Sequence, residues 1–248
     1  MKSKDSLSQI QAVILAGGKG TRLAPYTTIL PKPLMPISDM PVLEIILRQL
    51  KKAGIHRVTL SVGYLASLLE AYFGDGKMLD LSLRYSRESA PLGTAGPLKL
   101  IKNLRNTFFL MNGDVLTNLD LQAMLEFHRR HQAAATVGLF EKKVQINLGI
   151  IKTDAAERLI QYIEKPTLRY EVSVGIYVME PKVIDYIPAR KRFDLPELIT
   201  ALIADGQNVV GYRFKGYWLD IGRQEEYIKA VELFEKKRGY FLTRERKR

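Results

Sequence analysis

A glycine-rich loop near the start of the chain carries residue types that suit phosphate binding. It reads Leu15-Ala-Gly-Gly-Lys-Gly-Thr-Arg-Leu23 and follows a short apolar run at residues 11–16. Glycines let backbone N–H groups approach a phosphate closely, and Lys19 and Arg22 add positive charge. The loop lacks both the Gly-Lys-Ser/Thr ending of a P-loop and the third glycine of the dinucleotide fingerprint. Taken alone, it is more typical of a tight turn after a strand.

The overall composition restricts which kinds of site these residues can form. The 248 residues include no cysteine and only three scattered histidines, His56, His128 and His131. Disulfides, thiolate metal sites and histidine clusters are therefore excluded, and any metal is expected on oxygen ligands. No apolar run approaches the roughly 18 to 20 residues that a membrane span needs. We expect a cytoplasmic protein, because residues 1–8 also lack the apolar core of a secretory signal.

The net charge of +12 raises the question of nucleic-acid binding. Half of that surplus lies in residues 236–248, which hold seven Lys or Arg residues against one acid. We interpret this tail as a solvated chain end, with contact to a polyanion or a membrane surface as the alternative. The remaining positive charge is compatible with anionic small substrates such as a triphosphate or a sugar phosphate. We therefore expect no nucleic-acid partner.

The elements that would position the loop alternate between strands and helices over the first two-thirds of the chain. Strands are expected at 11–16, 57–62, 79–85, 107–111 and 134–140, and helices at 41–53, 65–73, 94–101 and 121–131. Such alternation predicts an α/β fold, a three-layer α/β/α sandwich around a mostly parallel, Rossmann-like sheet. Ligands of such sheets lie beyond the carboxyl ends of the strands, where segments 15–23 and 112–114 both fall.

The last third of the chain is richer in β-structure and more interrupted. Strands are expected at 148–152, 158–163, 172–179 and 209–214, and helices at 181–186, 195–204 and 224–237. No linker rich in Gly, Ser or Pro divides the chain, so we expect a single domain over residues 1–248. Within it we distinguish a nucleotide-binding half at 10–145, a sugar-phosphate-binding half at 146–222, and a C-terminal helix with the basic tail at 223–248.

Six sequence blocks occur in the order found in sugar-1-phosphate nucleotidylyltransferases, the enzymes of class EC 2.7.7 that make NDP-sugars. They are Leu15–Leu23 with Pro31–Ile37, Glu88–Leu98, Asn112–Asp114, Ile163–Pro166, Val174–Tyr177 and Gly216–Gly222. The chain resembles this family over residues 11–222, and Glu88–Leu98 is most similar to mannose-1-phosphate guanylyltransferases. The resemblance implies a nucleotide-diphospho-sugar transferase fold and nucleotidyl transfer from an NTP to a hexose 1-phosphate. GTP with mannose 1-phosphate is the first choice, and glucose-1-phosphate thymidylyl- or uridylyltransferase is the alternative.

The resemblance also implies roles for residues of the nucleotide half. The predicted nucleotide-binding residues are Leu15, Ala16, Gly17, Gly18, Gly20, Thr21, Gly93, Thr94, Asn112 and Gly113. Arg22 would stabilise the leaving pyrophosphate, and Lys32 would reach the phosphates. Asp114 and Asp220 would share Mg²⁺, since two carboxylates with substrate phosphates and waters suit that ion. Without the resemblance, Lys32 would pass for an ordinary surface lysine, Asp114 for a turn residue, and Thr94 for a helix N-cap.

In the sugar-phosphate half, the resemblance assigns five residues, one of them catalytic. They are Gly149, Glu164, Lys165, Ser173 and Gly175, with Lys165 as the ligand of the sugar phosphate. The sequence departs from the family here, because Ser173 stands where an asparagine is common and Asn147 interrupts another family pattern. These departures leave the sugar open. They also motivate a competing class, a catalytically silent regulatory subunit that binds an NDP-sugar. A homo-oligomer remains open as well.

Overall fold

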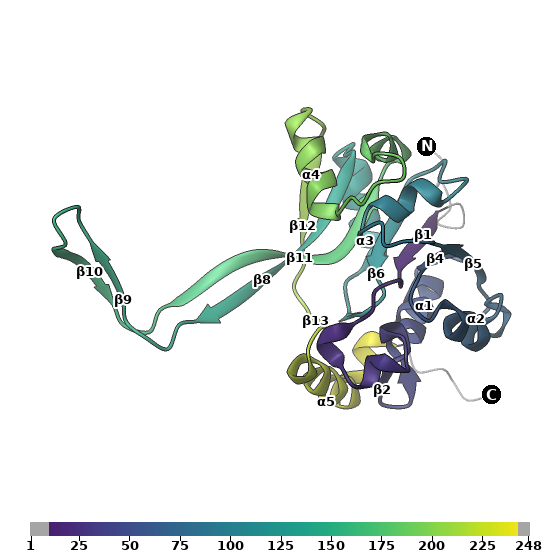
Figure 1. The fold of residues 1–248 in the computed structure, drawn as a ribbon, viewed down its shortest axis with the longest axis horizontal. Coiled ribbons are helices and arrows are strands. Elements are labelled where there is room, and N and C mark those ends of the chain that lie inside the picture. Colours follow the sequence, from purple (N-terminus) through teal and green to yellow (C-terminus); the bar gives the residue numbers. More distant parts are fainter. Residues whose placement is uncertain (1–9, 243–248) are drawn as a thin grey trace.

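A seven-stranded mixed sheet forms the centre of the fold (Figure 1). The computed structural model describes residues 10–242. The strand order is β12-β8-β11-β6-β1-β4-β5, and β11 is the one strand that runs antiparallel to its neighbours. The strands of this sheet are β1 Gln11–Leu15, β4 Arg57–Val62, β5 Ser82–Arg87, β6 Phe108–Asn112, β8 Ala135–Gln145, β11 Thr167–Met179 and β12 Val209–Arg213. The predicted, mostly parallel sheet is confirmed.

Helices cover both faces of the sheet. Successive side chains of a strand point to opposite faces, so each face contributes to a separate apolar core. Ile14 of β1 packs in one core with residues of α1, α2, α3 and α5, whereas Val13 packs in the other with residues of α4. The helices are α1 Val42–Lys52, α2 Ala66–Phe73, α3 Leu121–Arg130, α4 Leu195–Ala204 and α5 Gln224–Phe241. The predicted three-layer α/β/α sandwich is therefore confirmed.

Short strand pairs lie outside the main sheet. They are β2 Pro36–Ile37 with β3 Met40–Pro41, β7 Val115–Thr117 with β13 Trp218–Asp220, and β9 Ile150–Thr153 with β10 Leu159–Ile163. The β7–β13 pair matters most for function, because it joins the segment after β6 to a segment about a hundred residues further along the chain.

Several expected elements differ from the sequence prediction, among them the strands expected at 134–140 and 172–179, since β8 extends to Gln145 and β11 begins at Thr167. The segment expected as a helix at 94–101 is a 3₁₀ turn over Gly96–Leu100, where Gly96 disfavours an α-helix. Thr94 is not its N-cap, since the Thr94 hydroxyl instead accepts a hydrogen bond from the Leu195 N–H of α4. Residues 181–186 also form a 3₁₀ turn. Strand β5 begins at Ser82 rather than 79, because a 3₁₀ turn occupies residues 77–79.

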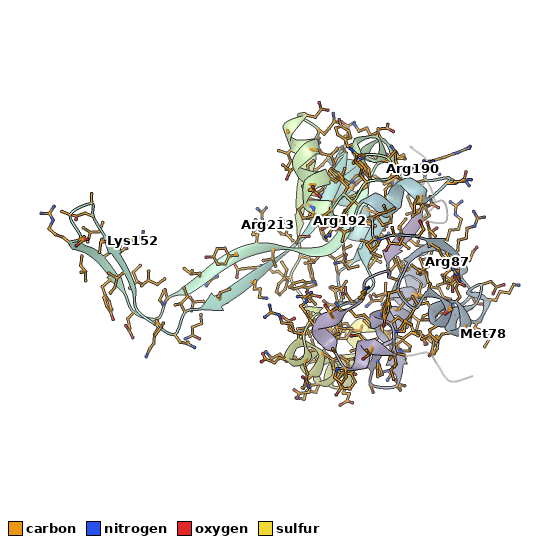
Figure 2. The ribbon with its side chains drawn as sticks, in the orientation of Figure 1. Met78, Arg87, Lys152, Arg190, Arg192 and Arg213 are labelled. Carbon is orange, nitrogen blue, oxygen red and sulfur yellow. The ribbon has the colours of Figure 1, made fainter. Side chains whose placement is uncertain are left out.

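Beyond the sheet, β8 and β11 continue together as a two-stranded ribbon that projects from the body of the molecule (Figure 1). Its outer end bends into the β9–β10 hairpin. We call residues 140–172 the arm. Figure 2 shows Lys152 on the outer hairpin and Arg213 near the place where the arm leaves the sheet. The segment expected to bind the sugar phosphate is thus divided between the arm and the body.

Two further expectations concern the ends and the surface. Of the basic tail expected at 236–248, residues 243–248 lie outside the described part of the chain, and α5 extends to Phe241. Within residues 10–242, no helix is both long and apolar enough to cross a lipid bilayer.

Candidate active site

A pocket of about 640 Å³ lies beyond the carboxyl ends of β1, β4 and β6. Backbone hydrogen bonds fix these strand ends to one another: Ala16 N–H donates to Ser61 O (2.8 Å) and Gly113 N–H donates to Leu15 O (2.9 Å). Eight of the predicted nucleotide-binding residues line the pocket, namely Leu15, Ala16, Gly17, Gly18, Gly93, Thr94, Asn112 and Gly113. The structure therefore brings together segments about twenty to nearly a hundred residues apart in sequence, as expected near the strand ends of a parallel sheet.

Glycines in the pocket wall allow close backbone contacts. A Cβ on Gly17 would lie 2.8 Å from the Glu88 carboxylate, and a Cβ on Gly113 would lie 2.9 Å from Leu15 O. Both distances are shorter than real side chains tolerate. Gly113 therefore requires glycine for packing alone, because its contact is with backbone, whereas at Gly17 the flexible Glu88 side chain would have to move.

Lys19 also lines the pocket, but the loop residues that follow it are not among the lining residues. Gly20 has φ 63°, and a Cβ there would press on Thr27 and Lys32. Thr21 and Arg22 belong to a 3₁₀ turn, Thr21–Leu23. Gly20 and Thr21 are thus predicted nucleotide ligands that the structure leaves outside the pocket lining.

Lys32 and Asp114 form a direct ion pair at the floor of the pocket. The Lys32 ammonium donates to Asp114 Oδ2, and the two side chains are only 11% and 22% exposed. Lys32 lies in a 3₁₀ turn whose neighbours Pro31 and Pro33 are buried. Proline restricts the backbone on both sides, so the lysine is held close to the carboxylate.

Asp220 lies beside this pair because β13 pairs with β7. Asp220 is the register partner of Val115, and the Ile221 N–H donates to Asp114 O (3.0 Å). Burial raises the pKa of the Asp220 carboxyl, and the negative charge of Asp114 raises it further. Arg22 approaches the same corner, since its guanidinium and the Asp220 carboxylate both lie within 3.3 Å of where a Cβ of Gly222 would be.

The donor set at this corner fits a hard divalent cation. Mg²⁺ commonly takes one or two carboxylates and fills its octahedron with substrate phosphates and water. Within residues 10–242, no group of three or more His, Cys, Asp or Glu side chains could hold a metal ion. Asp114 and Asp220 would therefore need substrate oxygens to complete a metal site. The raised pKa means that the charged form of Asp220 is disfavoured, and a nearby cation would stabilise that charged form.

The predicted sugar-phosphate residues fall into two groups. Gly175, with φ 72°, lies at the sheet beside Asn112, and the Ser173 hydroxyl contacts the Tyr177 hydroxyl (3.0 Å). Gly149, Glu164 and Lys165 lie instead on the arm. The Glu164 and Lys165 side chains are 58% and 60% exposed, and their charged groups are 3.7 Å apart. The fold of this chain does not bring the arm residues to the pocket.

Known proteins resemble this chain over most of its length. The nucleotidyl transferase family model matches residues 11–237. The chain belongs to the nucleotidyl transferase family. The mannose-1-phosphate guanylyltransferase of Mycobacterium tuberculosis is 39% identical over 230 residues, which are 90% of this chain and 64% of that protein. The UTP–glucose-1-phosphate uridylyltransferase of Synechocystis sp. is 34% identical over 242 residues, 90% of this chain and 62% of that protein.

Solved structures of other proteins have a fold similar to that of this chain. HddC from Yersinia pseudotuberculosis, solved in complex with GMP-PN, is 26% identical with a TM-score of 0.70 over 91% of this chain and 99% of that chain. An apo UDP-glucose pyrophosphorylase, 20% identical with a TM-score of 0.71 over 92% of this chain and 99% of that one, shares the fold. The chain spans only about 64% of the length of the curated relatives it matches.

Several residues that line the pocket escaped the sequence prediction, among them three with charged side chains. Glu88, Arg192 and Asp194 all line the pocket. Asp194 accepts hydrogen bonds from the N–H and the hydroxyl of Thr94 (2.9 and 3.2 Å), so it joins the pocket wall to the start of α4. Glu88 is the first residue of the block Glu88–Leu98 that resembles the family, which was a usable signal. Nothing in the sequence connects residues 192–194 with a site a hundred residues earlier.

Proposed function

We propose that the chain catalyses guanylyl transfer from GTP to mannose 1-phosphate, giving GDP-mannose and pyrophosphate, with Mg²⁺ as the cation. A phosphate oxygen of the sugar phosphate would attack the α-phosphorus of GTP. The new P–O bond forms as the bond to the bridging oxygen breaks, and its electron pair leaves with pyrophosphate. Such a reaction needs mainly positioning and neutralisation of charge.

The observation that carries the reaction class is the cluster at the pocket floor. Lys32 and Asp114 line the pocket, and Arg22 and Asp220 lie beside them on the 3₁₀ turn Thr21–Leu23 and on β13, so that two positive charges stand next to two carboxyl groups. In the proposed complex, Lys32 contacts the phosphates and Arg22 stabilises the charge that develops on the leaving pyrophosphate. Mg²⁺, when bound by Asp114 and Asp220, would neutralise the triphosphate and polarise the α-phosphate.

The choice of guanine rests on the Glu88 carboxylate. One of its oxygens accepts the Leu92 N–H (3.1 Å), which fixes the side chain, and the other faces Gly17 and Gly63 in the pocket wall. A carboxylate only accepts hydrogen bonds, and guanine offers the adjacent N1–H and N2–H₂ donors on one edge. Uracil and thymine present a single N–H between two carbonyl oxygens, which a carboxylate would repel. Glu88 therefore favours GTP over UTP and dTTP.

The choice of mannose 1-phosphate has weaker support from the chain itself. It rests on the 39% identity to the mycobacterial guanylyltransferase, because Ser173 and Asn147 depart from the family pattern in the sugar half. A relative that uses glucose 1-phosphate is 34% identical. Glucose 1-phosphate with GTP is thus the first alternative to include in an assay.

A substrate panel tests the proposal directly. Purified protein is assayed with GTP, UTP, dTTP and ATP against mannose 1-phosphate and glucose 1-phosphate, with and without Mg²⁺, and pyrophosphate release is measured. We expect turnover with GTP and mannose 1-phosphate only when Mg²⁺ is present. Absence of turnover with every pair rules the enzyme out. GDP-mannose binding without turnover would instead indicate a regulatory NDP-sugar-binding protein.

Changing Glu88 tests the base assignment. Glu88→Gln replaces a double acceptor by one donor and one acceptor, which matches the edge of uracil. We expect kcat/KM for GTP to fall about 10- to 100-fold, the loss of one charge-assisted hydrogen bond, while use of UTP rises relative to GTP. Glu70→Gln is the matched control, because that carboxylate pairs with Arg87 on the surface. Unchanged base preference in Glu88→Gln would remove Glu88 from base recognition.

A further inference from the structure

One charged side chain of the pocket wall takes no part in the proposed reaction. Arg192 lines the pocket, and its guanidinium contacts Asp194 Oδ2 at 3.3 Å. The Arg192 side chain is 73% exposed, and an ion pair exposed to that degree adds little to stability. Within residues 10–242, Asp194 is the one polar partner of this guanidinium. Because a guanidinium has five N–H donors, Arg192 has donors left for a ligand in the pocket.

Backbone hydrogen bonds fix Arg192 relative to Glu88. The Leu92 N–H donates to Glu88 Oε2 (3.1 Å), and the Leu92 carbonyl accepts the N–H of Phe193 (2.9 Å). Glu88 Oε2 therefore lies no more than about 10 Å from the backbone nitrogen that follows Arg192. The side chains of Glu88 and Arg192 line one pocket from adjoining parts of its wall. A carboxylate and a guanidinium are thus available to the same bound molecule.

The carboxylate that orients Arg192 is itself held by the pocket wall. Asp194 Oδ1 accepts hydrogen bonds from the N–H and the hydroxyl of Thr94 (2.9 and 3.2 Å), while Asp194 Oδ2 faces the guanidinium. The Leu195 N–H donates in return to the Thr94 hydroxyl (2.7 Å). These bonds leave Asp194 little freedom to turn. The Arg192 side chain therefore has a fixed carboxylate on one side and the pocket on the other.

The Glu88 carboxylate by itself does not distinguish guanine from every other base. It favours guanine over uracil and thymine, but adenine also offers an amino group that a carboxylate can accept. When guanine places N1–H and N2–H₂ on Glu88, its next edge presents O6 and N7, which only accept hydrogen bonds. Adenine carries its N6 amino donor at the place of O6. A group that only donates would therefore bind guanine at this edge and reject adenine, and a guanidinium is such a group.

We propose that Arg192 determines the choice of purine by donating two hydrogen bonds to O6 and N7 of guanine, while Glu88 accepts from N1–H and N2–H₂. This inference rests on the proposed function and deepens it, because it explains how the same pocket would select GTP over ATP. The planar fork of a guanidinium matches this pair of acceptors, as it does in the major groove of DNA. The phosphates are left to Lys32 and Arg22.

Base analogues test this pairing one atom at a time. 7-Deaza-GTP lacks N7 but keeps the edge that faces Glu88, whereas ITP lacks the 2-amino group and keeps O6 and N7. In the wild type we expect kcat/KM for each analogue to be about 10- to 100-fold below that for GTP, the loss of one hydrogen bond to a charged group. Arg192→Ala should use GTP and 7-deaza-GTP equally well and should still discriminate against ITP. A penalty for 7-deaza-GTP as large in Arg192→Ala as in the wild type would overturn the proposal.

Arg190→Ala is the matched control. Arg190 is an exposed arginine two residues before Arg192, and it is not among the residues that line the pocket. Figure 2 shows the two arginines at different places on the body. Arg190→Ala should keep the penalties for both analogues. If Arg192 instead binds a phosphate or the hexose, Arg192→Ala would lower kcat/KM for GTP and 7-deaza-GTP by the same factor, or would raise KM for mannose 1-phosphate alone. Either result would contradict the role in base selection.

A second measurement does not depend on turnover. Calorimetry gives the Kd of GTP and of 7-deaza-GTP for the wild type and for Arg192→Ala, and we expect the difference between the two nucleotides to disappear in the variant. A wild type that binds and uses UTP or dTTP in preference to GTP would contradict the proposed function, and the role of Arg192 with it. A wild type that prefers GTP but binds 7-deaza-GTP equally well would contradict the role of Arg192 alone.

Discussion

The pocket and the arm contribute to the same proposed reaction but are built in opposite ways. The pocket residues follow three buried, parallel strands, and backbone hydrogen bonds between the strand ends fix their positions. The arm residues lie on a ribbon that is exposed on both faces. A site on a packed sheet is positioned by its own chain, whereas a site on a ribbon depends on whatever covers the ribbon. The difference teaches that the sheet of this chain places most of the predicted nucleotide-binding residues, but it does not place the predicted sugar-phosphate residues of the arm.

The largest effect is expected at the floor of the pocket. Asp114→Asn removes the charge that faces Lys32 and one of the two proposed metal ligands. We expect kcat for pyrophosphate release to fall on the order of a thousandfold or more. Asp80→Asn is the control, since that exposed carboxylate pairs with Lys51 far from the pocket. More than a tenth of wild-type activity in Asp114→Asn would show that the floor is not the catalytic centre.

A smaller and more selective effect is expected on the arm. Lys165→Ala should raise KM for the sugar phosphate by about 10- to 100-fold, the loss of one ion-paired hydrogen bond. The Kd for GTP, measured by calorimetry, should stay unchanged because the pocket is built without the arm. Lys152→Ala removes an equal charge from the outer hairpin (Figure 2) and should leave both constants unchanged. Equal losses for GTP and sugar phosphate would erase the distinction between the two regions.

The sequence predicted the pocket far better than the arm, and the reason is physical. Strand ends of a parallel sheet converge wherever the strands do, so Gly17, Asn112 and Asp114 could be grouped from their positions alone. The period of apolar residues likewise reveals the core on each face. Gly20 and Thr21, which the sequence predicts to bind the nucleotide, are not among the residues that line the pocket. A loop's direction after its first residues depends on contacts such as Thr27 to Gly20, which no pattern encodes.

The arm shows where such reasoning ends. Its strands at 148–152 and 158–163 were predicted correctly to within a residue or two. Their place in space was not, because strand propensity says nothing about what a hairpin packs against. Asp194 and Arg192 were missed for a related reason: they reach the pocket through the contact with Thr94, a hundred residues away in sequence. Non-local partners of this kind become visible only in the fold.

We expect the charged carboxylate of Asp220 to lower the stability of the folded protein at neutral pH. Burial and the charge of Asp114 raise the pKa of Asp220, so its ionised form is disfavoured in the folded protein. Stability is therefore lost as pH rises from the carboxyl's usual value of 3.8 through its raised value. Asp220→Asn should melt at a higher temperature than the wild type at pH 7 without Mg²⁺, and this gap should shrink towards pH 4.

The same variant should lose most of its activity. Asp39→Asn is the control of opposite sign, because the hydrogen bond from Arg238 lowers the pKa of that carboxyl. It should melt no higher than the wild type at pH 7 and should keep its activity. A lower melting temperature for Asp220→Asn than for the wild type at pH 7 would contradict the prediction that the charge of Asp220 destabilises the folded protein.

The smallest effect is expected from two glutamates at opposite ends of β11. Glu171 lies at the arm end and pairs with Arg213, while Glu180 follows the body end and accepts from His128 (3.1 Å) and Thr107 (2.6 Å). The hydrogen bond from His128, more than any other contact, lowers the pKa of Glu180. Its contribution is thus present above the usual value of 4.5 and lost as pH falls through the lowered value.

Glu180→Gln should accordingly lower the melting temperature by roughly 2–4 °C at pH 7, with little change at pH 3, because buried His128 loses its charged partner. Glu171→Gln should have a smaller effect, since its pair with Arg213 is exposed to water and screened. Thermal melts of both variants at pH 3 and pH 7 measure the contrast. A larger loss in Glu171→Gln would mean that the base of the arm is as firmly packed as the body, which the exposure of the ribbon argues against.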